Sequence, residues 1–157
     1  MKLSTKGRYA VMAMADLAHH SKGKPIALAE VAQRQEISLS YLEQLFGRLR
    51  RARLVNSVRG PGGGYMLARE PLEMRISDII MAVDEPIKAT RCTPGAPGGC
   101  HSNRGRCLTH DLWEELGNQI FFYLSSVTLG DVCEKRILGS ARALYNAERP
   151  ELAAAAT

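Results

Sequence analysis

The sequence predicts a mainly α-helical chain with a small β-hairpin wing, arranged as a winged helix-turn-helix followed by a long C-terminal helix. Three observations lead to this prediction. Two helical segments separated by a tight turn lie near the N-terminus, and a glycine-rich hairpin follows them directly. A longer segment near the C-terminus carries apolar residues at steps of three and four. With 157 residues, the chain can form one compact domain and an appendage.

The first predicted helix begins near Ser4 or Thr5, since either side chain can cap a helix N-terminus. Its inward face is apolar and consists of Ala10, Ala13, Met14 and Leu17. Turn residues at 21–25 end this helix. A short second helix is expected at about 28–34.

A tight turn at 35–37 leads into a longer helix, expected at about 38–51. Ser38 and Ser40 can both cap it, and Ser40 with Glu43 three residues later has the spacing of a capping box. Turns of this kind often carry glycine, whereas this one carries glutamate.

The wing is predicted from two short β-type segments, 54–58 and 65–68, joined by the glycine-rich stretch 59–64. A further short helix is expected between Ser77 and Pro86. A helix-turn-helix followed at once by a hairpin has the order of elements of a winged helix.

The distribution of charge favours a polyanionic partner for the first half of the chain. Residues 1–70 hold 12 Lys and Arg against 5 Asp and Glu, whereas residues 71–157 hold 9 against 11. We expect a soluble, cytoplasmic protein with no membrane association, because apolar runs are short and the N-terminal run is broken by Asp16. Thiols stay reduced in that compartment, so the four cysteines suggest metal or redox chemistry.

The second helix of the pair has one apolar face and one polar face. Short polar side chains lie outward near its N-terminus and arginines toward its C-terminus, which suits contacts with base edges and phosphates. Gly47 on this face permits close approach. An ordinary solvated helix face is the alternative. The predicted DNA-contacting residues, including two in the wing, are Ser38, Ser40, Tyr41, Glu43, Gln44, Arg48, Arg51, Arg59 and Gly60.

Arg59 stands at the tip of the predicted hairpin. An arginine there can enter a DNA minor groove, where the negative potential is strongest. Its alternative role is that of a surface arginine beside a turn. The glycines that follow lack the Gly-Lys-Ser/Thr ending of a nucleotide-binding loop.

Cys92, Cys100, Cys107 and His110 are separated by seven, six and two residues. Three thiolates and an imidazole suit either zinc or an iron–sulfur cluster, and the long spacers match a paired-cysteine zinc site poorly without excluding it. The start of the next helix, near Thr109, would stabilise a negatively charged cluster. His101 is a competing ligand that directly follows a cysteine, and Cys133 is expected to be a buried structural thiol.

The long helix is expected to form a homodimer, because its apolar residues make a coiled-coil-like seam. That seam consists of Trp113, Leu116, Ile120, Tyr123 and Val127. Burial of the seam against the chain's own domain is the alternative. A dimer would present two recognition helices to a palindromic double-stranded DNA operator.

Several longer motifs carry a resemblance. They are STKGRYA (4–10), ISLSYLEQLF (37–46), VRGPGGGY (58–65), AVDE (82–85) and CLTH (107–110). From Met1 to about Leu129 the chain resembles the IscR-type iron–sulfur cluster regulators, a family of bacterial winged-helix transcription factors.

The resemblance implies a [2Fe–2S] cluster held by Cys92, Cys100, Cys107 and His110, and control of genes for cluster assembly. It also implies that cluster-assembly proteins act as cluster donors and that Glu43 discriminates between operators. The spacers between the cysteines are longer here than is usual in the family.

Two other functions remain open at this point. One is a zinc-stabilised or thiol-based redox regulator, a repressor or activator on the same fold, and the other is an electron-transfer iron–sulfur protein. We expect no enzymatic activity, since no nucleophile–base pair or cofactor loop is apparent. The expected division of the chain is a DNA-binding domain (1–86), a cysteine-rich loop (87–108), a dimerisation helix region (109–138) and a tail (139–157).

Overall fold

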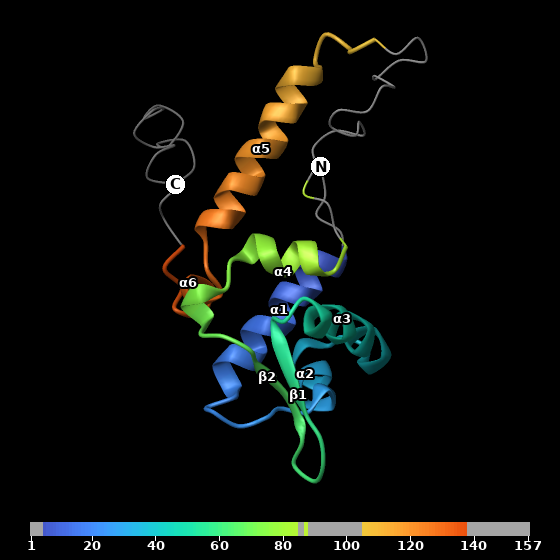
Figure 1. Ribbon diagram of the computed structural model, residues 1–157, viewed down its shortest axis with the longest axis vertical. Coiled ribbons are helices and arrows are strands. Elements are labelled where there is room, and N and C mark those ends of the chain that lie inside the picture. The colour runs from blue at the N-terminus through green and yellow to red at the C-terminus, as the bar shows by residue number, and fades with distance from the viewer. Residues whose placement is uncertain (1–4, 85–86, 88–104, 138–157) are drawn as a thin grey trace, which may run out of the picture.

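The structure, a computed structural model, describes residues 5–84, 87 and 105–137 (Figure 1). Its helices and two strands follow the predicted order and confirm the fold class. In chain order they are α1 (Thr5–His20), α2 (Leu28–Gln35), α3 (Leu39–Arg51), β1 (Val55–Val58), β2 (Gly64–Leu67), the 3₁₀-helix η1 (Pro71–Glu73), α4 (Ile76–Ala82), α5 (His110–Ser126) and α6 (Leu129–Cys133).

Helix α1 lies at the centre of the fold and contacts α2, α3, α4, α6 and β2. The apolar face predicted for it is confirmed, because Ala10, Ala13, Met14 and Leu17 have no exposed surface. Apolar side chains of α3 complete this core from the other side: Leu42, Leu45, Phe46 and Leu49. Burial of each large side chain contributes about 1.5–3 kcal/mol, so the two helices are held mainly by these contacts.

The turn between α2 and α3 contains a residue in the left-handed region. Glu36 has φ 54° and ψ 40°, and it occupies the place where glycine is common in such turns. Ser38 caps α3, since its hydroxyl accepts a hydrogen bond from the Tyr41 amide at 3.3 Å. The prediction of a capping box at Ser40 and Glu43 was wrong, because Ser38 has the extended backbone that a cap needs and Ser40 already lies inside the helix.

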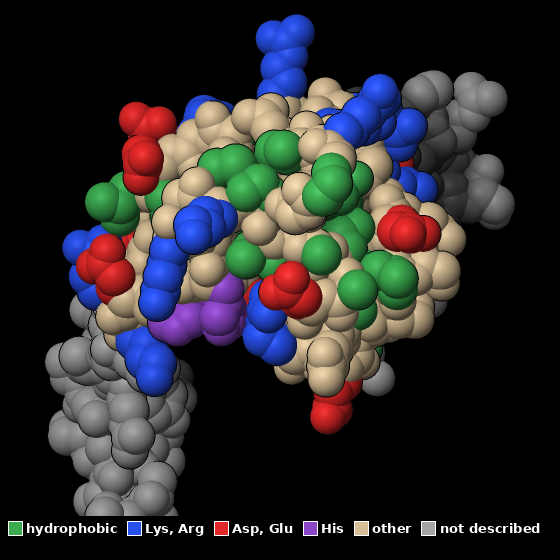
Figure 2. Space-filling view, turned by 90° about the horizontal axis from the view of Figure 1, so that it is seen from below, with side chains coloured by type: hydrophobic (Ala, Val, Ile, Leu, Met, Phe, Trp, Pro, Cys, Tyr) green, Lys and Arg blue, Asp and Glu red, His purple; other side chains and the backbone are tan. Residues whose placement is uncertain are grey.

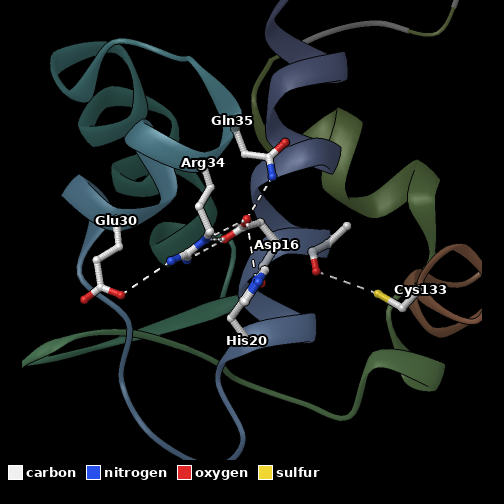
Figure 3. A network of polar contacts seen from close by, with 7 residues as sticks. Asp16, His20, Glu30, Arg34, Gln35 and Cys133 are labelled. Carbon is white, nitrogen blue, oxygen red and sulfur yellow. Dashed lines mark hydrogen bonds and ion pairs between the residues drawn. The ribbon is translucent and has the colours of Figure 1, made fainter.

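A polar network fixes α2 against α1 (Figure 3). The buried Asp16 carboxylate accepts hydrogen bonds from Arg34 Nη2 at 2.7 Å, from Arg34 Nε at 3.1 Å and from Gln35 Nε2 at 2.8 Å. The His20 ring lies 3.6 Å from the same carboxylate. Burial of Asp16 opposes its ionisation, but the donors from Arg34 and Gln35 outweigh this effect, so the pKa of Asp16 lies below its usual value.

The wing is an antiparallel pair in which Val55 faces Leu67 and Val58 faces Gly64. A bridge between Ile26 and Tyr65 ties this hairpin to the segment before α2. Glycine is required at position 64, because a Cβ there would lie 2.2 Å from the Ile26 carbonyl oxygen. The hairpin is therefore attached to the helical core by close backbone contact.

Helix α5 extends away from the winged helix and is anchored at its C-terminal end (Figure 1). The Ile76 amide donates to the Val127 carbonyl at 3.0 Å, and the Leu129 amide donates to the Met74 carbonyl at 2.8 Å. The Arg75 side chain donates to the carbonyl of Ser125. Backbone and side-chain bonds thus join the end of α5 to the start of α4.

The short helix α6 was not expected. It begins at a capping box in which Thr128 and Asp131 bond reciprocally, and Leu129 is fully buried in the core. Cys133 lies half-buried at its end with Sγ 3.8 Å from the Ala15 carbonyl oxygen. Burial and the nearby Glu134 charge raise the pKa of the Cys133 thiol, which suits the predicted structural role.

Candidate DNA interface and cluster site

The outward face of α3 carries four of the predicted DNA-contacting side chains. Ser40, Glu43, Gln44 and Arg51 are all exposed. Gly47 lies among them, and apart from the adjoining backbone of α3 no atom comes within 4 Å of the position that its Cβ would take. Packing within the chain therefore does not require glycine here, and the α3 backbone is open to approach from outside.

Two predicted contacts have structural roles in α3. The Ser38 hydroxyl is engaged as the helix cap. Tyr41 is half-buried, and its ring packs edge-on against that of Tyr9 with centroids 6.0 Å apart. Both residues lie at the N-terminal end of α3, so they orient the end of the helix that carries Ser40 and Gln44.

Arg48 is engaged with the end of α4. Its Nη1 donates to the Val83 carbonyl at 3.2 Å and to the Asp84 carboxylate. Sequence reasoning placed Arg48 beside the outward face and did not identify this partner, because the pair is separated by 36 residues. The AVDE motif marks the position of Asp84, although nothing in it specifies the contact.

The wing tip places Arg59 and Gly60 at the surface, where both are exposed. Gly60 has φ 103° and Gly62 has φ 72°, a region that other residues rarely adopt. A Cβ on Gly63 would lie 2.4 Å from the Val58 carbonyl oxygen. The glycines therefore form a narrow tip. Viewed from the wing end, lysine and arginine side chains lie mainly along the top and left of a group of hydrophobic ones, with acidic side chains interspersed (Figure 2).

The two predicted cluster ligands within the described residues lie together at the start of α5. The His110 amide donates to the Cys107 carbonyl at 3.0 Å, which places both residues in a single turn. His110 is buried, with 8% of its surface exposed, and Cys107 is half-buried with Sγ 3.6 Å from the Thr109 hydroxyl. Thr109 precedes the helix as expected but makes no side-chain cap. Cys92 and Cys100 lie outside the described residues.

Charged residues of the first turns of α5 and of the segment before it adjoin His110. Glu114 Oε2 lies 3.5 Å from His110 Nε2, and the ligand atoms of His110, Asp111 and Glu114 all lie within 4.8 Å of one another. Arg106 contacts Asp111 at 3.3 Å and Glu114 at 3.9 Å. The spacing of His110 and Glu114, one helical turn apart, is the sequence signal for this contact.

The predicted seam of α5 is mostly exposed. Trp113, Leu116 and Tyr123 have 45%, 38% and 48% of their surface exposed, and Ile120 is half-buried. Val127 differs, because it follows the helix and packs against the chain's own core. An exposed apolar stripe of this length on one helix is unusual for a surface that faces only water.

A family model described as "Rrf2: Iron-dependent Transcriptional regulator" matches residues 3–135. The chain belongs to the Rrf2 family. It is also 52% identical over 134 residues to the HTH-type transcriptional regulator IscR of Photorhabdus laumondii, covering 84% of this chain and 79% of that protein. Over 132 residues it is 50% identical to the IscR of Escherichia coli K12, with 84% and 80% covered.

Solved structures agree with this assignment. The chain superposes on IscR of T. potens with a TM-score of 0.69 at 39% identity, covering 87% of this chain and 88% of that one. It superposes on CymR, the global cysteine regulator of B. subtilis, with a TM-score of 0.70 at 34% identity, covering 86% and 98%. This member of the Rrf2 family is therefore a DNA-binding winged-helix transcriptional regulator and not an enzyme. In the described part of the chain, no helix has both the length and the hydropathy to cross a membrane.

Proposed function

We propose that this regulator senses iron–sulfur cluster status through a [2Fe–2S] cluster and controls genes for cluster assembly. The cluster is held by Cys92, Cys100, Cys107 and His110, and cluster-assembly proteins act as donors. The observation that supports this most strongly is the pairing of Cys107 and a buried His110 in one turn at the start of α5, in a chain about half identical to IscR regulators.

The described donors fit such a cluster. Thiolate and imidazole are the ligands that iron–sulfur clusters accept in proteins. The first turn of α5 presents backbone amides and the positive end of the helix dipole, which favours a negatively charged cluster. Glu114 Oε2 lies 3.5 Å from His110 Nε2, so this carboxylate can help to orient the imidazole as a ligand. The fraction of the protein that carries the cluster would report the supply of iron–sulfur clusters in the cell.

DNA reading is assigned to the outward face of α3 and to the wing. Ser40 and Gln44 contact base edges, Arg51 contacts phosphate, and Arg59 enters the minor groove. Glu43 is tolerated only where it finds a donor such as cytosine N4, which gives it a role in discrimination between operators.

The regulator acts as a homodimer through α5. Its exposed seam of Trp113, Leu116, Ile120 and Tyr123 repeats at steps of three and four, the spacing by which two helices pack along a common axis. Removal of these side chains from water on pairing provides the driving force for the dimer.

Anaerobic purification followed by absorption spectroscopy between about 400 and 600 nm, with iron and acid-labile sulfide analysis, tests the cluster. We expect visible absorption and about two irons and two sulfides per chain. Cys107→Ala should abolish both signals and leave a folded protein, whereas Cys133→Ala, the matched control, should leave them unchanged. A colourless protein with stoichiometric zinc would contradict the proposal.

The wing is tested separately with Arg59→Ala, which removes an exposed side chain and should not alter the melting temperature. Operator affinity should fall, with a flatter dependence on salt concentration. An unchanged affinity would exclude the minor-groove role.

A further inference from the structure

We propose that Arg48 and Asp84 form a latch that positions α3 for base recognition, and that Arg48 acts through this latch instead of neutralising a DNA phosphate. The latch joins the recognition helix to the end of α4.

Arg48 makes two contacts with the end of α4, one with a backbone carbonyl and one with a carboxylate. The Val83 carbonyl, which accepts from Nη1 at 3.2 Å, belongs to the residue that caps the C-terminus of α4. Carbonyls at such an end have no partner within their own helix, so the guanidinium completes the hydrogen bonding of α4. The same Nη1 donates to the Asp84 carboxylate, which brings opposite charges together.

The backbone at Asp84 is specialised for this contact. Asp84 has φ 58°, in the left-handed region that aspartate and asparagine tolerate better than most residues. Its amide donates to the Met81 carbonyl at 3.1 Å, which closes the last turn of α4. With 76% of its side chain exposed, Asp84 does not contribute to the core. The residue is therefore suited to the ion pair and not to packing.

The latch acts on the C-terminal half of α3. On the roughly opposite side of that helix, given 100° per residue, Arg50 Nη1 lies 3.4 Å from the Ser57 hydroxyl of β1. The two contacts hold the helix from both sides. Base recognition depends on hydrogen bonds within a few tenths of an ångström of their ideal length, so a small rotation of α3 would misplace Gln44 and Ser40.

The charge of Arg48 is already compensated in the protein. A phosphate contact would require the pair with Asp84 to open, and its net contribution to the salt dependence of binding would be small. Arg51 provides the comparison, because it is an exposed arginine of the same helix on the outward face.

The experiment compares Asp84→Gly, Arg48→Gln, the double variant and Arg51→Gln in the full-length chain. Glycine suits the left-handed backbone at position 84, and it removes only an exposed side chain. Affinity is measured over a range of salt concentrations for a duplex selected from a random library with the unmodified protein. A scrambled duplex of equal length measures non-specific binding.

We expect Asp84→Gly and Arg48→Gln each to weaken binding to the selected duplex by about tenfold, the loss expected when one contact of α3 with a base edge is misplaced. Binding to the scrambled duplex and the salt dependence should change much less than they do in Arg51→Gln. The double variant should be no weaker than either single variant. Arg51→Gln should instead weaken both duplexes and flatten the slope of log K against log salt by about 0.9.

Other outcomes would overturn the latch. Unchanged specific binding by Asp84→Gly would mean that the pair does not position α3, and tighter binding would mean that it restrains Arg48 from DNA. A flattened slope in Arg48→Gln would mean a direct phosphate contact. Thermal unfolding checks each variant. If Asp84→Gly does not fold, Asp84→Asn takes its place, since asparagine tolerates the same backbone. A parallel loss of specific and scrambled binding by Asp84→Asn would also refute the positioning role.

Discussion

The Asp16 network offers a sharp test of how α2 is held against α1. Asp16→Asn preserves the size of the side chain but removes its charge and replaces one acceptor oxygen with a donor nitrogen facing Arg34 and Gln35. The carboxylate is fully buried, whereas 30% of the Arg34 side chain is exposed and can regain water. Breaking a buried ion pair costs about 3–5 kcal/mol, so partial rehydration of Arg34 places the expected loss at about 2–3 kcal/mol.

Urea unfolding followed by circular dichroism measures this loss at a fixed protein concentration. The melting temperature should fall by about 5–10 °C. Glu30→Gln is the matched control, because Glu30 pairs with Arg34 at 3.5 Å on the surface and should cost less than about 0.5 kcal/mol. A loss for Asp16→Asn as small as that of the control would refute the argument that burial makes this carboxylate important.

The pH dependence follows from the direction of the pKa shift. Burial opposes the ionisation of Asp16, but the hydrogen bonds from Arg34 and Gln35 outweigh it, so the pKa of Asp16 is lowered on folding. Ionisation of Asp16 therefore stabilises the folded state at pH values above its ordinary pKa of 3.8. That stabilisation should decline as the pH falls from 3.8 through the lower value of the folded state. Asp16→Asn should show a weaker decline of unfolding free energy over this acid range. Equal acid sensitivity of both proteins would contradict the assignment.

Three further variants test the fold and the proposed dimer. Gly64→Ala should destabilise the protein by about 2 kcal/mol or more in urea unfolding, since its Cβ would collide with the Ile26 carbonyl; a neutral result would refute the close approach. Ser38→Ala should lower the free energy of unfolding by about 1 kcal/mol through loss of the α3 cap, whereas Ser40→Ala should not change it measurably. The reverse order would indicate that Ser40 caps the helix. Leu116→Glu should shift the protein from dimer to monomer in analytical ultracentrifugation without unfolding α1, and a persistent dimer would place the interface elsewhere.

Hydrophobic periodicity was sufficient to predict α1 and α3 and their buried faces. Met14 and Leu17 on α1 and Phe46 on α3 are buried as their spacing indicates, because a face of this width has to be covered by another element. Helix α6 was missed although Thr128 and Asp131 have capping-box spacing, since the helix has only five residues and too few apolar positions to show a period.

The long-range polar contacts could not be predicted in the same way. Arg48 and Asp84 are 36 residues apart, and Asp16 and Arg34 are 18 apart. No local pattern links such pairs, because their proximity is decided by how whole helices pack. As residue types, Ser38 and Ser40 are equally suited to cap a helix. Only the backbone conformation, which is extended at Ser38, decides between them.

The anchoring of α5 at its C-terminal end has a geometric consequence for the proposed dimer. From Leu116 to Ser126 the helix rises by about 15 Å, and the carbonyl of Ser125, next to its last residue, is tied to the winged helix through Arg75. If the two α5 helices of the dimer cross near Leu116, a change in their crossing angle moves the C-terminal end of each helix, and the domain attached to it, about that point. Each 15° of crossing angle would move the DNA-reading domain by about 4 Å, slightly more than the rise of one base pair. The crossing angle between the two helices would thereby set the spacing of operator half-sites that the protein accepts.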